Sequence, residues 1–254
     1  MEVLACVKRV PMVGGKIVIT PNGCAIDTRM SGFTVSPHEE CAVEEAVRLA
    51  ERHGGTVTVL TLGPPEAADQ LRDALALGAS RAVLLETDGR EWGPMATAEA
   101  IVAAIGRAGQ PYDLLLFGNE SADTGGYQVP VRVAHALGLP CATGIKGIEV
   151  AADGGRVTAR REHLGAEETF DLPLPTVISV KEGINLPRYP SLPGRLRAKR
   201  ASLERFTPDW HAEGLAIAGL RVPATERHRA EILGAGTDAV PALVALLAEL
   251  GVLS

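Results

Sequence analysis

The run DLLLF at residues 113–117 is followed by GNESADTGG at residues 118–126 and by a helix-forming segment that ends at Leu137. An almost entirely apolar run of five residues is typical of a strand that is buried on both faces of a sheet. Short apolar strands alternate with helical segments throughout residues 3–137. This alternation predicts an α/β fold, an open parallel sheet with helices on both faces.

Helix caps and apolar runs place the other elements of this sheet. Ser36 is expected to be an N-cap, with Pro37 at the first helical position and Glu39 completing a capping box, in a helix that ends at Gly54. No Gly-x-Gly-x-x-Gly motif follows a predicted strand, so an ordinary NAD-type site is not indicated. Further strands are predicted at 3–7, 56–62 and 81–86, helices at 67–77, 95–107 and 127–137, and a hairpin at 16–27.

The pattern changes after Cys141. Strands are predicted at 145–150, 156–162, 168–172 and 176–180, and together they suggest an antiparallel extension attached to the parallel sheet. Residues 1–205 are therefore expected to form one domain. Residues 206–254 have too little apolar periodicity to build a core of their own. We expect them to form a C-terminal arm, with a helix at about 238–250, that lies on another surface.

Composition narrows the possible functions of the 254-residue chain. The aromatic content of 4% and the net charge of −6 argue against nucleic-acid binding. A short N-terminal apolar run precedes Lys8 and Arg9, so no signal peptide is predicted, and no apolar stretch reaches the length of a membrane span. Four scattered cysteines without a C-x-x-C pair suggest reduced thiols and a cytoplasmic location rather than disulfides or a zinc site.

The stretch LPRYPSLPGRLRAKR at residues 186–200 holds three prolines, which exclude helix interior and central strand from residues 186–194. An extended, stiff surface loop with Leu192 pointing outward is expected there. Residues 188–205 contain six basic residues and one acid. The stretch is either a docking device for an acidic partner or a solvated linker with a chance basic cluster.

The loop at residues 118–126 is the strongest candidate for a ligand site. Ligands of an open parallel sheet bind beyond the carboxyl ends of its strands, where this loop meets the loops after Val7 and before Ser36. Adjacent glycines allow backbone N–H groups to approach an anion, and Ser121 and Thr124 can donate hydrogen bonds. The pattern suggests a mononucleotide phosphate cradle. A capped helix with a glycine turn is the simpler alternative.

The motif NLPRYPSLP at residues 185–193, with the basic run after it, resembles the signature of the electron-transfer flavoprotein β subunit. The similarity extends to VKRV at 7–10, VEEAVRL at 43–49, ALALGASRAVLLE at 74–86 and the sequence DTG at 123–125. The resemblance implies a Rossmann-like, adenine-nucleotide-binding fold in a heterodimer with an α subunit that holds most of an FAD. It also implies electron transfer from dehydrogenases of the acyl-CoA type toward a quinone oxidoreductase, rather than substrate bond chemistry.

The resemblance also implies roles for individual residues. The flavin would be bordered by Val13 and His38, although His38 could be an ordinary exposed helix residue. Leu192 would be the anchor of a docking surface with Arg195, Arg197, Lys199 and Arg200. AMP, or a second FAD as in bifurcating relatives, would contact Cys6, Ser36, Pro37, His38, Glu39, Leu62, Gly118, Asn119, Glu120, Ser121, Ala122, Asp123, Thr124 and Gly125.

Two departures from the family pattern leave the identity of the nucleotide open. Many relatives have Asn-Pro-aromatic at residues 36–38, and the segment before Asp123 is shorter than in mitochondrial-type members. A competing class is a self-contained nucleotide-binding protein of the stress type, which would need neither an α subunit nor a docking leucine. The paired acids Glu162 and Glu168 fit the charged flanks of a hairpin better than an acid–base pair.

Overall fold

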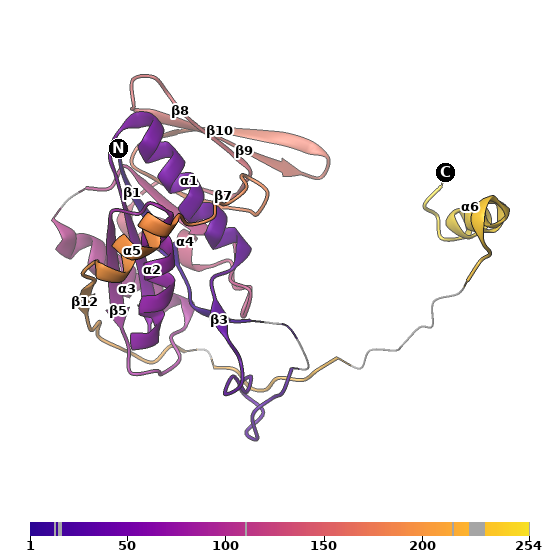
Figure 1. Ribbon diagram of the computed structural model, residues 1–254, viewed down its shortest axis with the longest axis horizontal. Coiled ribbons are helices and arrows are strands. Elements are labelled where there is room, and N and C mark those ends of the chain that lie inside the picture. Colours follow the sequence, from indigo (N-terminus) through magenta and orange to yellow (C-terminus); the bar gives the residue numbers. More distant parts are fainter. Residues whose placement is uncertain (13, 15–16, 110, 215, 224–231, 254) are drawn as a thin grey trace.

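The computed structural model describes residues 1–12, 14, 17–109, 111–214, 216–223 and 232–253 (Figure 1). Among these residues, seven strands form one sheet in the order β12-β5-β4-β1-β6-β11-β7. Every neighbouring pair in it is parallel. The strands are β1 (Glu2–Val7), β4 (Thr56–Gly63), β5 (Arg81–Glu86), β6 (Leu114–Gly118), β7 (Cys141–Ile145), β11 (Thr176–Val180) and β12 (Glu204–Phe206).

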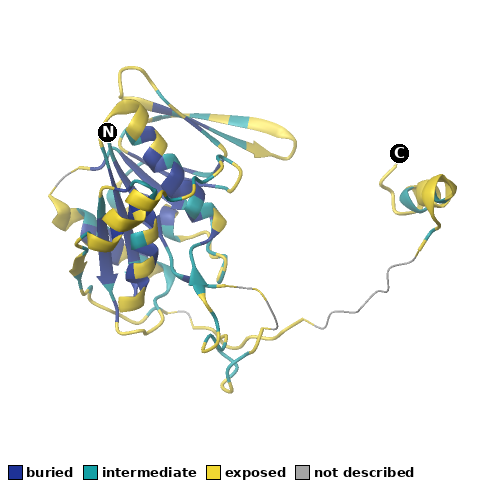
Figure 2. Cartoon of the chain, viewed as in Figure 1, coloured by how far each residue is buried: buried dark blue, intermediate teal, exposed yellow. Residues whose placement is uncertain are grey.

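Helices cover both faces of this sheet, which confirms the predicted fold class. Alternating residues of β1 show the division, because Val3 and Ala5 join one buried cluster and Leu4 and Cys6 join the other. Helices α1 and α2 pack into the first cluster, and α3 and α4 pack into the second. The buried residues accordingly follow the sheet and the inner helix faces (Figure 2). The helices are α1 (Pro37–His53), η1 (Pro65–Ala67), α2 (Ala68–Leu77), α3 (Pro94–Ala108), α4 (Val129–Leu137) and α5 (Leu192–Arg200).

The antiparallel extension is a separate sheet of β8 (Gly147–Val150), β9 (Arg156–His163) and β10 (Ala166–Pro173). The sequence interpretation was wrong for the fourth strand of this group. That strand, β11, pairs in parallel with β6 and β7 in the main sheet. Its side chains are all buried, as expected for a strand covered on both faces. The strand β7 was missed because CATGI lacks a continuous apolar run.

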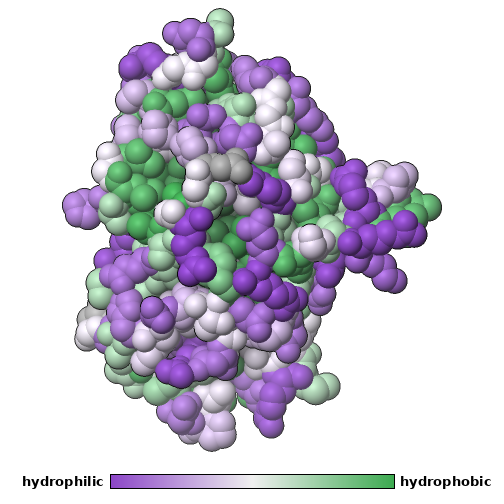
Figure 3. Space-filling model, turned by 90° about the vertical axis from the view of Figure 1, so that its left-hand side faces the viewer, coloured by the Kyte–Doolittle hydropathy of each residue, from purple (hydrophilic) through white to green (hydrophobic). Residues whose placement is uncertain are grey.

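Two smaller features complete the body. A two-stranded ladder joins β2 (Val10–Pro11) to β3 (Phe33–Thr34). In the described part of the predicted hairpin at 16–27, the only antiparallel bridge joins Ile19 to Ile26. The face of the molecule shown in Figure 3 has hydrophobic patches interrupted by hydrophilic side chains. No helix within the described ranges is long and apolar enough to cross a membrane.

The C-terminal segment ends in the short helix η2 (Gly236–Ala239) and α6 (Val240–Glu249). Figure 1 shows α6 apart from the α/β body. None of its ten residues is buried in the described structure, although the helix is largely apolar. The start of the segment is part of the body, because β12 pairs with β5 in the main sheet up to Phe206. This strand therefore crosses the predicted boundary at 205/206.

Candidate functional site

Three loops meet at the carboxyl edge of the main sheet. The end of β1, the start of α1 and the loop after β6 are joined by direct contacts. The Ala122 N–H donates to Ser36 Oγ at 2.9 Å, and Lys8 Nζ lies 2.7 Å from the Asp123 carboxylate. Lys8 Nζ also lies 3.4 Å from Thr124 Oγ1. The structure therefore brings together the three loops that the sequence predicts to converge.

Glu39 and Cys6 lie beneath this site. The Glu39 carboxylate accepts the Lys8 N–H at 3.0 Å and the Ser36 N–H at 2.9 Å, the second being half of the predicted capping box. Burial raises the pKa of Glu39 to about 7, although these hydrogen bonds and the Lys8 charge oppose the shift. Burial also raises the pKa of the Cys6 thiol. Glu39 therefore holds the end of β1 and the start of α1 together, and both buried groups present little surface to a ligand.

The loop after β6 contains both fixed and exposed residues. Asn119 is hydrogen-bonded to β11. Its N–H donates to the Val180 carbonyl, and its side-chain oxygen accepts from Ser179 Oγ at 3.1 Å. A Cβ atom at Gly118 would lie 2.6 Å from Glu39 Cγ, so only glycine permits this close approach of β6 to α1. Ala122 and Thr124 are exposed. The part of the loop that can meet a ligand is thus its second half.

The second half of the loop brings a left-handed glycine and two hydroxyl groups beside an ion pair. Gly125 has a φ of +54°, in the left-handed region that favours glycine. Thr124 Oγ1 lies 2.9 Å from Ser121 Oγ, and the Thr124 N–H donates to the Asp123 carboxylate. Burial alone would raise the pKa of Asp123, but hydrogen bonding and the charge of Lys8 outweigh it and lower the pKa. Lys8 and Asp123 therefore form an ion pair beside the hydroxyl groups.

The helix after this loop begins later than predicted. α4 starts at Val129, and Tyr127 has a φ of +55° with its side chain exposed. The loop therefore does not open directly into a helix, because α4 begins two residues later than predicted. A tyrosine in the left-handed region gives no signal in a helical pattern, which is why the boundary was misplaced.

His38 is held between two segments. Its Nδ1 accepts the Glu182 N–H at 2.9 Å, and its Nε2 lies 3.4 Å from the Glu120 carboxylate. Both ring nitrogens therefore have protein partners. Val13, the second residue expected to border a flavin, lies outside the described residues. Leu62 is half-buried and packs against the cluster under α3 and α4.

Sequence reasoning missed Lys8 as a site residue. Its position directly after the first buried strand could have identified it, because such residues lie at the edge where ligands of a parallel sheet bind. Its partner Asp123 is 115 positions away in the sequence, so their pairing could not be read from local spacing. Glu168 instead pairs with Arg161 across β10 and β9, and Glu162 pairs with Lys146, which precedes β8.

The predicted docking stretch is a loop followed by a helix. The prediction of a loop up to Gly194 was wrong, because α5 begins at Leu192 with Ser191 as the N-cap. Pro193 is tolerated there since the first turn of a helix needs no backbone donor. Leu192 does point outward, with 72% of its surface exposed, and Leu196 one turn later is 52% exposed.

The basic run lies on the same helix. Arg197 donates to the Leu75 carbonyl at 3.4 Å. Within the described ranges, no salt bridge engages the four cationic side chains of the predicted docking surface, which are Arg195, Arg197, Lys199 and Arg200. α5 therefore presents two exposed leucines among positive charges.

These features define an α/β protein in which three loops converge at the carboxyl edge of a parallel sheet, the place where such folds bind ligands. Residues 24–210 match the model of the electron transfer flavoprotein domain. The chain belongs to the electron transfer flavoprotein β subunit family.

Three relatives show how far the similarity extends. The chain is 36% identical to the electron transfer flavoprotein subunit beta of Bacillus subtilis over 82% of this chain and 80% of that protein. It is 34% identical to the subunit beta of Mycobacterium tuberculosis over 92% of this chain and 91% of the relative. The mitochondrial subunit beta of Oryza sativa is 35% identical over 82% and 83% of the two chains.

Proposed function

We propose that this chain pairs with an electron transfer flavoprotein α subunit and carries electrons through an FAD at their interface. The FAD is held mainly by the α subunit, and electrons pass from a dehydrogenase of the acyl-CoA type toward a quinone oxidoreductase. The match of residues 24–210 to the electron transfer flavoprotein domain, together with the similarity to β subunits over most of the chain, supports this function. The stress-type alternative has no comparable support.

The C-terminal arm is our candidate for the contact with the α subunit. α6 is largely apolar, yet none of its residues is buried in the described structure. A helix with no buried face gains little from folding alone, so it needs a partner surface. We place the heterodimer in the cytoplasm, since all four cysteines are free thiols.

The site at the carboxyl edge is proposed to hold AMP. Lys8 supplies a positive charge that a phosphate would share with Asp123, Thr124 supplies a hydroxyl, and Gly125 supplies a backbone that can approach a phosphate closely. His38 and Val13 are proposed to border the flavin, with His38 positioned by its contacts to Glu120 and Glu182. Nucleotide released from the purified heterodimer and identified by mass tests this assignment. One AMP and one FAD per dimer are expected, and two FAD would indicate a bifurcating relative.

The docking surface is proposed to be α5, with Leu192 as its anchor and Arg195, Arg197, Lys199 and Arg200 around it. The exposure of Leu192 beside cationic side chains supports this role. An apolar anchor that enters a partner pocket contributes about 2 kcal/mol or more, while the surrounding charges mainly speed encounter. The partner is then a dehydrogenase with an apolar pocket rimmed by carboxylates.

Leu192→Ala tests the docking role. We expect the dehydrogenase-dependent reduction rate of the flavin to fall roughly tenfold, since about 1.4 kcal/mol corresponds to a factor of ten. The flavin spectrum, nucleotide content and melting temperature should stay unchanged because the side chain is exposed. Reduction by dithionite serves as the control. A wild-type rate with every dehydrogenase tried would show that Leu192 is not the anchor.

A further inference from the structure

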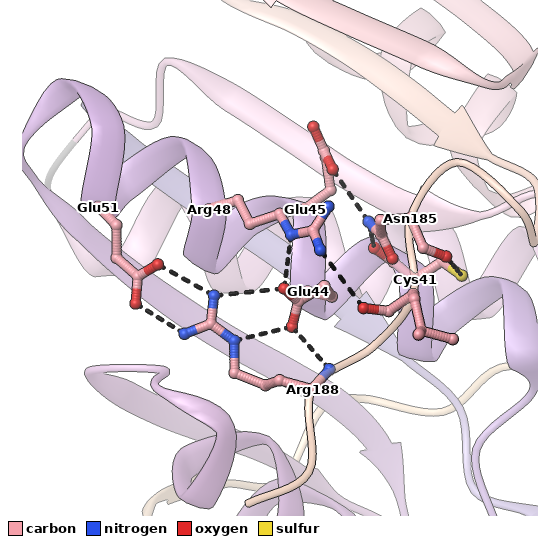
Figure 4. A network of polar contacts seen from close by, with 8 residues as sticks. Cys41, Glu44, Glu45, Arg48, Glu51, Asn185 and Arg188 are labelled. Atoms are coloured by element: carbon pink, nitrogen blue, oxygen red, sulfur yellow. Dashed lines mark hydrogen bonds and ion pairs between the residues drawn. The ribbon is translucent and has the colours of Figure 1, made fainter.

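Arg188 ties the loop before α5 to helix α1 (Figure 4). Its backbone N–H and its Nε donate to Glu44 Oε2 at 3.1 and 2.9 Å, and its Nη2 donates to Glu44 Oε1 at 3.2 Å. The same guanidinium donates to both oxygens of Glu51, at 2.7 and 3.0 Å. One arginine therefore fixes the loop to two carboxylates that lie two turns apart on α1.

The Glu44 carboxylate is fully enclosed. Only 1% of this residue is exposed, and Arg48 Nε donates to it at 2.6 Å in addition to Arg188. Burial alone would raise the pKa of Glu44, but the hydrogen bonds from Arg188 and Arg48 outweigh it and lower the pKa. A buried carboxylate without such partners would be strongly destabilising.

Stability alone does not explain this arrangement. Apolar side chains of similar volume often stabilise a fold as well as a buried ion pair does, whereas an ion pair fixes a geometry. The forked guanidinium fits a carboxylate only in certain orientations. The Arg188–Glu44 pair thus fixes the loop against the side of α1 at a point four residues before Leu192.

The body of α5 is fixed independently against α2. A Cβ atom at Gly194 would lie 2.5 Å from the Ala76 carbonyl oxygen, so the first turn of α5 approaches α2 as closely as glycine allows. At the other end, Arg72 Nη1 donates to the Ala198 carbonyl at 2.7 Å. From Gly194 onward the helix therefore has little freedom to shift along α2, whereas the position of Leu192, which precedes these contacts, also depends on the loop that Arg188 holds.

We propose that Arg188 and Glu44 are positioning residues, which present Leu192 in a preformed geometry to the electron-donating dehydrogenase. This inference rests on the proposed docking role of α5. A loop that is already ordered loses less conformational entropy on binding, so the affinity for the partner is higher. The carboxylates on α1 thereby act on electron transfer without contacting the flavin or the partner. Leu196, exposed one turn after Leu192, extends the same presented surface.

The first test measures the loop and the transfer rate in the same heterodimer. Arg188→Lys keeps the charge but cannot bridge both carboxylates. We expect faster amide hydrogen exchange in residues 186–196 and about a fivefold lower kcat/KM for the dehydrogenase, with kcat at saturation unchanged. Arg156→Gln, which breaks an ion pair with Asp171 on the antiparallel sheet, is the matched control and should change neither quantity.

A double-mutant cycle with Leu192→Ala separates positioning from general stability. If Arg188 acts through Leu192, adding Arg188→Lys to Leu192→Ala should lower kcat/KM by less than twofold further. An undiminished fivefold loss in that background would overturn the inference, as would a wild-type rate for Arg188→Lys alone. A wild-type rate for Leu192→Ala is a different result, which would remove the docking role itself and the positioning role with it.

A milder variant keeps the inference testable if Arg188→Lys fails to fold. Glu51 is exposed, so Glu51→Gln removes the ion pair between Arg188 and Glu51 and leaves the buried pair with Glu44 intact. We expect a loss in kcat/KM of about twofold, again abolished by Leu192→Ala. Equal losses with and without Leu192 would contradict the proposal.

Discussion

At the scale of single residues, we expect Glu39 to make the stability of the fold depend on pH. Burial raises its pKa from an ordinary value of 4.5 to about 7, so the folded protein binds a proton there more tightly than the unfolded chain does. A raised carboxyl pKa stabilises the fold fully below pH 4.5. That stabilisation is lost as the pH rises from about 4.5 to 7, by about 3 kcal/mol in total.

We therefore expect Glu39→Gln to remove this part of the pH dependence. The free energy of unfolding of the wild type, minus that of the variant, should decrease between pH 4.5 and 8 when measured by urea titration. Glu66→Gln, which replaces an exposed carboxylate near α2, is the control and should leave the pH dependence unchanged. A difference that is constant across this range would show that Glu39 is not the titrating group.

Residues whose roles depend on local spacing could be predicted, and those whose roles depend on distant partners could not. The cap formed by Ser36 and Glu39 could be predicted because the two residues are three positions apart, the spacing of a capping box. The contacts of His38 with Glu120 and Glu182 depend on how the strands are ordered in the sheet. The same holds for the Arg188–Glu44 pair, whose members are 144 positions apart.

At the scale of elements, the loop between β6 and α4 is the unit that the proposed nucleotide site depends on. Gly125→Val places a β-branched side chain at a φ of +54°, which strains the backbone and blocks approach to a phosphate. We expect the purified heterodimer to lose most of its AMP and to melt at a lower temperature, because bound nucleotide stabilises only the folded form.

The control for this loop is Gly154→Val, which introduces a similar strain at a φ of +71° in an exposed turn of the antiparallel sheet. It should lower the melting temperature without changing the nucleotide content. Full AMP content in Gly125→Val would contradict the assignment of the cradle.

The elements themselves could be predicted where apolar runs are continuous, as for β5, which has the predicted bounds of Arg81–Glu86. The prolines at 187, 190 and 193 identified a surface segment, but their spacing does not show that the third opens a helix. Proline is unfavourable inside a helix and favourable in its first turn, so Pro193 is compatible with both interpretations. Only the packing of Gly194 against α2 decides between them.

At the scale of the whole molecule, the C-terminal segment has two parts with different attachments. Its root is bound to the body, since the Glu213 carboxylate accepts the Ala96 N–H in the first turn of α3 at 2.7 Å. His211 Nε2 lies 2.6 Å from Glu99 on the same helix, and the guanidinium of Arg90 stacks on the ring of Trp210. These contacts could not be predicted, because the segment has no apolar periodicity. The far part, α6, has no buried residue in the described structure.

This division predicts different consequences for two truncations. A chain that ends at Leu220 keeps the contacts of Trp210, His211 and Glu213, so we expect it to fold with a nearly unchanged melting temperature but to lose association with the α subunit.

A chain that ends at Phe206 also loses the carboxylate at the start of α3. Loss of such a cap costs about 1 kcal/mol, which lowers the melting temperature of a protein of this size by about 2–4 °C. Glu213→Ala in the full chain should reproduce that decrease while heterodimer formation, measured by gel filtration, persists. If the chain ending at Leu220 still binds the α subunit, the interface lies on the α/β body and α6 has another partner.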